Sequence, residues 1–162
     1  MRRILRAAIR GAVSGAIGMI VMDVLWYSRY VEDGGRRDPL SWEFAAGVDS
    51  WDRAPAPAKV GRLAVKQVTG TDPDPAWVPT MNNIVHWLTG AGWGAVYGLL
   101  NTFSHPDAIP FTTLVWGLPY VALVPSGIYK PIWDYDVETI AKDYSAHILY
   151  GTSLALAYRL LR

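Results

Sequence analysis

Hydrophobic and polar residues alternate along this chain in long blocks, and four of the apolar blocks have the length of a bilayer-crossing helix. A hydrocarbon core of roughly 30 Å needs about 20 mainly apolar residues of helix. The blocks cover about 11–29, 81–103, 109–129 and 144–161. They lack the charged face that each helix of a soluble bundle carries, which disfavours four core helices of a soluble domain. The pattern predicts an all-α fold, a four-helix transmembrane bundle.

The polar segment 31–79 lies between the first two blocks and is predicted to form an outer loop. Within it, Ala56 to Gly70 reads as a short amphipathic helix, with Pro57 in its first turn and Gly70 as its C-terminal cap. Two positions are open for this helix. It lies along the outer membrane surface, or it packs as a lid on the outer end of the bundle.

Arginine predicts the orientation of the four spans, because cytoplasmic loops carry an excess of lysine and arginine. Four arginines precede the first span and two end the last, at positions 2, 3, 6, 10, 159 and 162. Both termini are therefore expected on the cytoplasmic side of a multi-pass protein of the bacterial inner membrane. The start also resembles a signal peptide, but no small-residue cleavage site follows it, and Asp23 and Trp26 occupy that region.

The composition of the chain excludes several classes of function and of metal site. Of the 162 residues, 51% are apolar and 18% are charged, the net charge is +1, and there is no cysteine. A basic face that could neutralise phosphates of nucleic acid is lacking. Disulfides and thiolate-ligated metals are excluded. The length predicts one integral membrane domain, 1–162.

A fifteen-residue pattern occurs twice, in the second and fourth spans. Both copies read H-x-x-x-G-x-x-x-[G/A]-x-x-Y-x-L-L, beginning at His86 and at His147. The repetition suggests that the bundle consists of two related helical hairpins in the same orientation, a parallel repeat about an axis along the membrane normal.

Small residues recur at one-turn intervals in each copy and are expected to be helix-packing positions: Gly90, Gly94, Gly151 and Ala155. Spacings of 4, 8 and 11 keep the histidine, the small residues and the tyrosine on one helix face. Small residues four apart allow close approach of helix backbones in a membrane. The second and fourth spans are predicted to face each other, or a common axis, through these faces.

Three ionisable residues from three spans reach a similar depth. Asp23 lies about 20 Å along the first helix from Arg10, and His86 and His147 lie roughly 6 to 10 Å below the outer boundary at ~1.5 Å per residue. A carboxylate at such depth costs roughly 2.5 to 3.5 kcal/mol unless it is paired. We therefore expect a shared polar, protonatable site, supported by Asn82, Asn83, Tyr27 and Tyr129.

Several roles are compatible with such a site. A histidine beside a carboxylate titrates near neutral pH, which points to proton or small-solute handling or pH sensing. The polar groups would otherwise only fix helix packing. A bis-histidine haem b or a divalent metal at His86 and His147 also matches ligand preferences. The competing class is a structural or accessory subunit that forms a homo-oligomer or joins a larger membrane complex. No nucleophile or phosphate-loop motif supports an enzyme.

The repeated string, with His86, Gly90, Gly94 and Tyr97 in one copy and His147, Gly151 and Tyr158 in the other, resembles the YagU-like group of small bacterial inner-membrane proteins of unknown function. The resemblance covers the second and fourth spans. It implies a four-helix membrane fold, a link to acid survival and hence a proton-linked role, and no cofactor. It carries over no functional residue.

Overall fold

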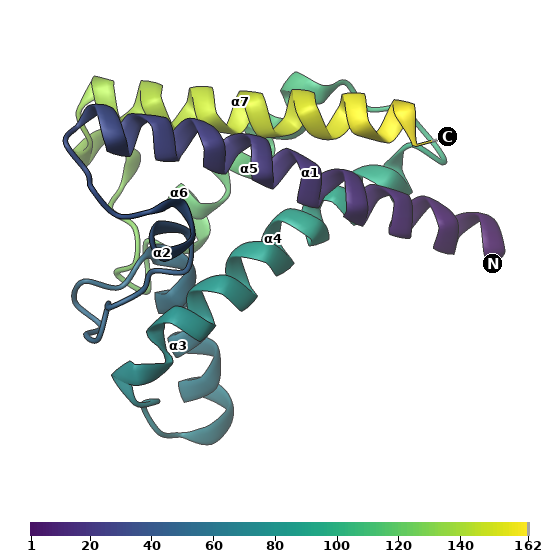
Figure 1. Cartoon of the computed structure of the whole chain (residues 1–162). Coiled ribbons are helices and arrows are strands. Elements are labelled where there is room, and N and C mark those ends of the chain that lie inside the picture. Colours follow the sequence, from purple (N-terminus) through teal and green to yellow (C-terminus); the bar gives the residue numbers. More distant parts are fainter. Residues whose placement is uncertain (162) are drawn as a thin grey trace. The chain divides into compact units, whose positions relative to one another are not determined.

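The computed structural model describes residues 1–161, and it confirms the predicted all-α class: no strand occurs among these residues (Figure 1). Contacts divide the chain into two compact units. The bundle unit comprises Met1–Trp26 and Thr89–Arg162, and the loop unit comprises Tyr27–Leu88. The helices are α1 (Arg2–Glu32), α2 (Pro39–Glu43), α3 (Ala56–Thr69), η1 (Pro75–Trp77), α4 (Val78–Leu100), α5 (Ala108–Gly117), α6 (Pro119–Ala122), η2 (Ile132–Asp134) and α7 (Val137–Leu160).

Only α1, among the helices described, is long and apolar enough to cross a membrane by length and composition. A signal sequence near an N-terminus would meet the same criterion. Helices α4 and α7 have sufficient length, but polar residues such as Asn82 and Asn83 in α4 and Lys142 and Asp143 in α7 lower their hydropathy. The four-span arrangement expected from the sequence is therefore not confirmed, and one described helix meets the criterion for a span.

The apolar block 109–129 does not form one continuous helix. Helix α5 ends at Gly117, the short α6 follows it, and turns and irregular chain cover most of 123–131. The apolar helical stretch Ala108–Ala122 spans roughly 22 Å at ~1.5 Å per residue, less than a bilayer core. Pro119 and Pro125 account for the interruption, because proline has no backbone N–H to donate and clashes with the preceding turn.

Helices α1 and α4 are in backbone contact through glycines within the bundle unit. A Cβ on Gly94 would lie 2.7 Å from the Cα of Gly15, and a Cβ on Gly98 would lie 3.0 Å from the Cα of Gly11. Real Cβ atoms essentially never come as close as 2.7 Å to a neighbour, and 3.0 Å is at the lower limit of their contacts. The glycines of α4 therefore pack on α1, where Gly11 and Gly15 stand one turn apart, and only hydrogen fits between the two backbones.

The corresponding face of α7 meets a different neighbour. A Cβ on Gly151 would collide with the side chain of Thr112 in α5, whose Cβ lies 2.8 Å from that position. The two small-residue faces therefore do not pack directly on each other: the α4 face packs on α1, and the α7 face packs on α5.

Two tyrosines of α7 nevertheless join that helix to α4. The Tyr150 hydroxyl donates to the carbonyl of Gly90 at 2.8 Å, and the Tyr158 hydroxyl donates to the carbonyl of Gly98 at 3.3 Å. Both tyrosines are buried, with 2% and 5% of their surface exposed. Because glycine has no side chain to cover its carbonyl, each of these two carbonyls accepts a hydrogen bond from α7.

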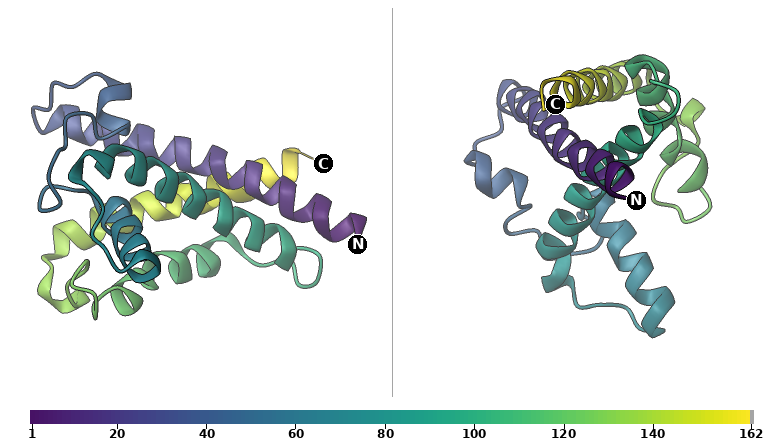
Figure 2. Two further views of the ribbon diagram at one scale, coloured as in Figure 1. Left: turned by 90° about the horizontal axis from the view of Figure 1, so that it is seen from below. Right: turned by 90° about the vertical axis from the view of Figure 1, so that its right-hand side faces the viewer.

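The first and last described residues lie at the same end of the bundle unit, which both views of Figure 2 show. This end also holds the α4–α5 loop, because one cavity is lined by Arg3, Thr102 and Leu161 together. An even number of helix passes is the simplest path that returns the chain to its starting end.

The loop unit has a small core of its own. Trp51, Ala54, Ala58 and Val78 are buried together, with Met81 packed against them. The predicted helix over Ala56 to Gly70 is confirmed as α3, and Gly70 caps it at φ +73°.

Helix α3 also contacts α4 within the loop unit. A Cβ on Gly61 would lie 3.1 Å from the Cβ of Met81 in α4, and 3.2 Å from a methyl group of Val85. Helix α3 therefore packs on the start of α4 within the loop unit.

Candidate functional site

Asp143 organises a polar cluster in the bundle unit. It lies in the second turn of α7, whose N-terminus is capped by the Asp136 side chain. Since residues four apart share a helix face, Asp143 and His147 are neighbours. The imidazole Nδ1 lies 3.4 Å from the carboxylate Oδ1 and 2.9 Å from the backbone carbonyl of Asp143. Both side chains are about one-fifth exposed.

The other carboxylate oxygen of Asp143 faces α5 and α6. The indole Nε1 of Trp116 donates to Oδ2 at 2.9 Å, and the hydroxyl of Tyr120 donates to it at 2.7 Å. The Tyr120 ring is also in edge contact with the rings of Tyr129 and Tyr135, at centroid distances of 5.1 and 5.4 Å. One carboxylate thus links α7 to α5 and α6 inside a group of aromatic side chains.

These donors keep Asp143 ionised. Burial raises the pKa of the Asp143 carboxyl, but hydrogen bonds from His147, Tyr120 and Trp116 together lower the pKa by more. The net shift is downward from the ordinary value of 3.8. Asp143 precedes the segment expected to form the fourth span, and it stays negatively charged at every physiological pH. The group of this pair that can change charge near neutral pH is therefore the imidazole of His147.

The loop unit contains a second histidine–carboxylate pair. Nε2 of His86, in α4, lies 3.8 Å from Oε1 of Glu43, at the end of α2. Both side chains are less than one-fifth exposed. Asn82, one turn before His86, is buried and donates from Nδ2 to the backbone carbonyl of Glu43 at 3.4 Å. Two of the residues predicted for the polar site therefore hold α2 against the start of α4.

The remaining predicted site residues have separate roles. Asn83 donates to the carbonyl of Pro79 within its own helix, at 2.8 Å. Tyr27 donates to the carbonyl of Arg37 at 3.0 Å, and its ring contacts that of Trp42. Asp23 is a partly buried residue of α1 in the bundle unit. Its membership of a shared site with the histidines stays a prediction.

The structure adds two carboxylates that the sequence interpretation did not assign to a site. Asp143 was detectable, because an aspartate four residues before a histidine on one helix is a recognised pairing. Its position next to the expected boundary of the fourth span made it look like a helix-start residue. Glu43 was not detectable, since its contact with His86 joins positions 43 residues apart across a polar loop.

The chemistry available here is reversible protonation within an electrostatic pair. Nδ1 of His147 is directed at Asp143, which leaves Nε2 to accept a proton. The same nitrogen is also the one that could bind a metal or a haem iron, and a histidine whose other nitrogen contacts a carboxylate is a common metal ligand. Comparison with protein-family models, curated proteins and solved structures gives no match for this chain.

Proposed function

We propose that this chain is a multi-pass helical protein of the bacterial inner membrane that senses or handles protons through Asp143 and His147. The membrane location is supported by large apolar side chains exposed along the bundle unit. Soluble monomers rarely expose extended apolar surfaces. On α1 these side chains recur at intervals of three and four residues: Ile9, Val13, Ile17, Ile20 and Val24. Similar exposed side chains occur along the α5–α6 segment and on α7: Leu114, Leu118, Val121, Leu156 and Leu160.

A plan of two related hairpins, α1 with α4 and α5 with α7, agrees with the contacts. In each hairpin, the small-residue face of the second helix packs on the first: Gly94 against α1, and Gly151 against α5. Tyr97 and Tyr158 correspond in the repeat, and their rings are in edge contact at a centroid distance of 5.7 Å. Corresponding residues meet in this way when they lie close to the axis that relates two copies. With both termini at one end and arginines concentrated near them, the proposed orientation has this end in the cytoplasm.

The observation that carries the functional proposal is the divided role of the Asp143 carboxylate. Oδ2 accepts hydrogen bonds from α5 and α6, while Oδ1 faces His147 of α7. When the imidazole gains a proton, it becomes a cation beside this anion and attracts Oδ1 more strongly. The change competes with the hydrogen bonds from Trp116 and Tyr120. Protonation of one side chain is thus coupled to the contact between α7 and its neighbours.

A proton-linked role agrees with what the resemblance to the YagU-like group implies. The pair of Glu43 and His86 offers a second protonatable group, and we retain Asp23 as a candidate member of the polar site. The accessory-subunit alternative receives less support. The glycine faces that would dock onto a partner are occupied within the chain, Gly90 and Gly94 by α1 and Gly151 by Thr112.

Nuclear magnetic resonance of the three histidines tests the proposal. The full chain, with ¹⁵N-labelled histidine and in detergent micelles, would be titrated between about pH 5 and 8, the range in which histidine changes charge. Each resonance is assigned with His86→Gln, His105→Gln and His147→Gln. We expect His147 to titrate within this range, and the indole N–H resonance of Trp116 to shift with the same midpoint.

Two variants separate this proposal from a purely structural role of the pair. In Asp143→Asn the coupling between His147 and Trp116 should be lost, whereas His105→Gln, which alters an exposed loop histidine, should leave it unchanged. A His147 resonance that stays constant over the whole range would overturn the proposal. So would an indole signal of Trp116 that shifts equally in the presence and absence of His147.

A further inference from the structure

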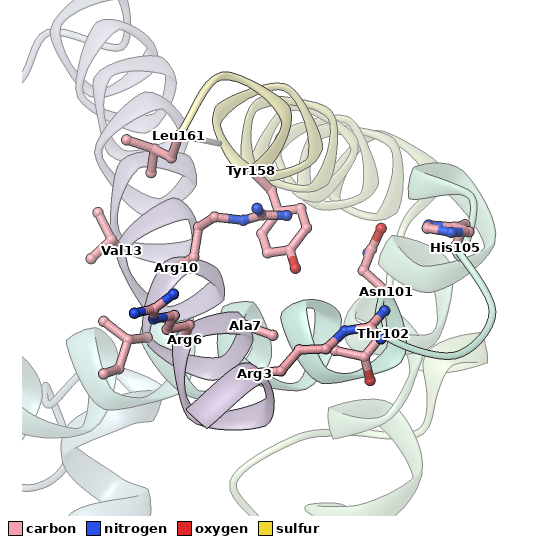
Figure 3. A pocket seen from close by; sticks show the side chains of 11 residues that line it. Arg3, Arg6, Ala7, Arg10, Val13, Asn101, Thr102, His105, Tyr158 and Leu161 are labelled. Atoms are coloured by element: carbon pink, nitrogen blue, oxygen red, sulfur yellow. The ribbon is translucent and has the colours of Figure 1, made fainter. Parts of the chain in front are cut away.

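A cavity of about 760 Å³ lies at the end of the bundle unit that holds both termini. Side chains of α1 form one side of it, and those of the α4–α5 loop form the other, with α7 completing the wall (Figure 3). Its polar lining is Arg3, Arg6, Arg10, Asn101, Thr102 and His105. None of these residues belongs to the Asp143 cluster or to the pair of Glu43 and His86.

The cavity concentrates positive charge, and no carboxylate among residues 1–161 forms an ion pair with its three arginines. Arg3, Arg6 and Arg10 follow one another at intervals of three and four residues, so they share a face of α1 where like charges repel. An adjoining smaller cavity shares Arg10 and His105 and adds Arg159; the acidic residue in its lining is Asp107.

Arg10 is held in place but is not saturated with hydrogen bonds. Its guanidinium carbon lies 3.6 Å from the centroid of the Tyr158 ring, a cation–π contact that fixes its plane. Its Nε atom is fully buried and has no hydrogen-bond partner in the described structure. A buried donor without an acceptor is unfavourable. An anion with several oxygens in the cavity would offer acceptors to this guanidinium.

We infer that this cavity binds a phosphate group, supplied by the headgroup of an anionic phospholipid. Guanidinium groups present paired N–H donors that match phosphate oxygens, and Asn101 and Thr102 offer neutral donors opposite them. A soluble phosphate compound would present the same phosphate group to the cavity. The assignment to a lipid rests on the membrane location proposed above, whereas the anion site itself does not.

The apolar part of the lining favours a lipid. Ile9, Val13 and Leu161 line the same cavity, and they are 55%, 46% and 44% exposed. Arg10 lies at the expected start of the first span, at headgroup level. Basic pockets between helices on the cytoplasmic side of a membrane are known to hold anionic headgroups. A phospholipid would place its phosphate among the arginines and its acyl chains along these apolar side chains, a surface that free phosphate would leave uncovered.

Native mass spectrometry and thermal unfolding of the full chain in neutral detergent test this inference. The probes are phosphatidylglycerol, phosphatidylcholine and inorganic phosphate. We expect phosphatidylglycerol to bind about tenfold more tightly than phosphatidylcholine, because the choline cation of phosphatidylcholine offsets the charge of its phosphate and is repelled by the arginines. Arg10→Gln should remove this preference. Because Arg10→Gln also loses the contact with Tyr158, Arg3→Gln provides a second variant that leaves this contact intact.

Arg2→Gln is the matched control, because Arg2 precedes Arg3 in the same helix, carries the same charge and does not line the cavity. It should retain the lipid preference. Equal losses in Arg2→Gln and Arg3→Gln would reduce the effect to overall charge and overturn the site. Binding of inorganic phosphate, dependent on Arg10 and without any preference for phosphatidylglycerol, would overturn the lipid assignment. The histidine titration does not involve these arginines, so a failure here is distinguishable from a failure of the proposed function.

Discussion

Replacing Gly94 by alanine should weaken the contact between α1 and α4, because the new Cβ would meet the backbone of α1. The new Cβ would lie 2.7 Å from the Cα and 2.8 Å from the amide nitrogen of Gly15. Carbon atoms in contact prefer about 3.5 to 4.0 Å. Because both atoms belong to a helix backbone, no side-chain rotation relieves the clash, and the helices must separate by about 1 Å.

The expected magnitude follows from two opposing effects. Overpacking of a well-packed contact costs about 1 to 3 kcal/mol, and a rigid backbone neighbour favours the upper part of that range. Alanine is also a better helix former than glycine by roughly 0.5 to 1 kcal/mol. Gly92→Ala measures that gain alone, because a Cβ at Gly92 would meet nothing within 4 Å. The propensity gain is common to both variants, so they should differ in free energy of unfolding by the overpacking cost alone, about 2 to 3 kcal/mol.

Equilibrium unfolding in mixed detergent micelles, followed by circular dichroism, measures this difference. Gly15→Ala examines the same contact from the other helix, since its Cβ would lie 2.9 Å from the Cα of Gly94, and it should be destabilised to a similar extent. A difference below about 1 kcal/mol between Gly94→Ala and Gly92→Ala would refute the close approach of α1 and α4.

Three further predictions concern stability and cofactors. Asp143→Ala removes the acceptor shared by Trp116 and Tyr120, and the two unsatisfied donors should lower the free energy of unfolding by about 2 to 4 kcal/mol. The control Asp134→Ala, at an exposed position, should leave the free energy of unfolding nearly unchanged. Equal effects of the two variants would contradict the role of Asp143. Because the folded-state pKa of Asp143 is depressed below 3.8, its contribution is complete above that pH and is lost as the pH falls through the lower folded value. The difference in melting temperature between wild type and Asp143→Asn should therefore not shrink between about pH 7 and 5, where protonation of His147 strengthens the pair, and it should shrink only below about pH 4; shrinkage near pH 6 would contradict this prediction. The purified protein should show no Soret absorption, and a stoichiometric Soret band abolished by His147→Leu would replace the proton-linked proposal with a haem protein.

The sequence predicted those elements whose cause is local. Helix α3 and its cap follow from Pro57 and Gly70. The apolar blocks cover the greater part of α4 and the middle of α1, which extends beyond its block at both ends. The third block was predicted to form one continuous helix, and that prediction was wrong. Its uncharged, apolar character concealed Pro119 and Pro125, which interrupt the helix. Proline was visible in the sequence, but hydropathy averaged over a window does not register a missing backbone donor.

The candidate site was harder to predict, because its partners are set by tertiary packing. The repeat identified both histidines and the small residues one turn apart. It could not identify which helix each small-residue face meets, although Gly11 and Gly15 of α1 carry the same spacing as Gly90 and Gly94. The contact of Trp116 and Tyr120 with Asp143 depends on how α5 and α6 pack on α7. No pattern along the chain specifies that packing.

Cysteine labelling in intact cells tests the membrane topology most directly. The chain has no native cysteine, so Ala46→Cys in the outer loop and Ser104→Cys in the α4–α5 loop each provide a single, exposed thiol. A membrane-impermeant maleimide should label Ala46→Cys in intact cells, and should label Ser104→Cys only after the inner membrane has been permeabilised. Labelling of both thiols in intact cells, or of neither, would place the two loops on one side and contradict a chain that crosses the bilayer between them.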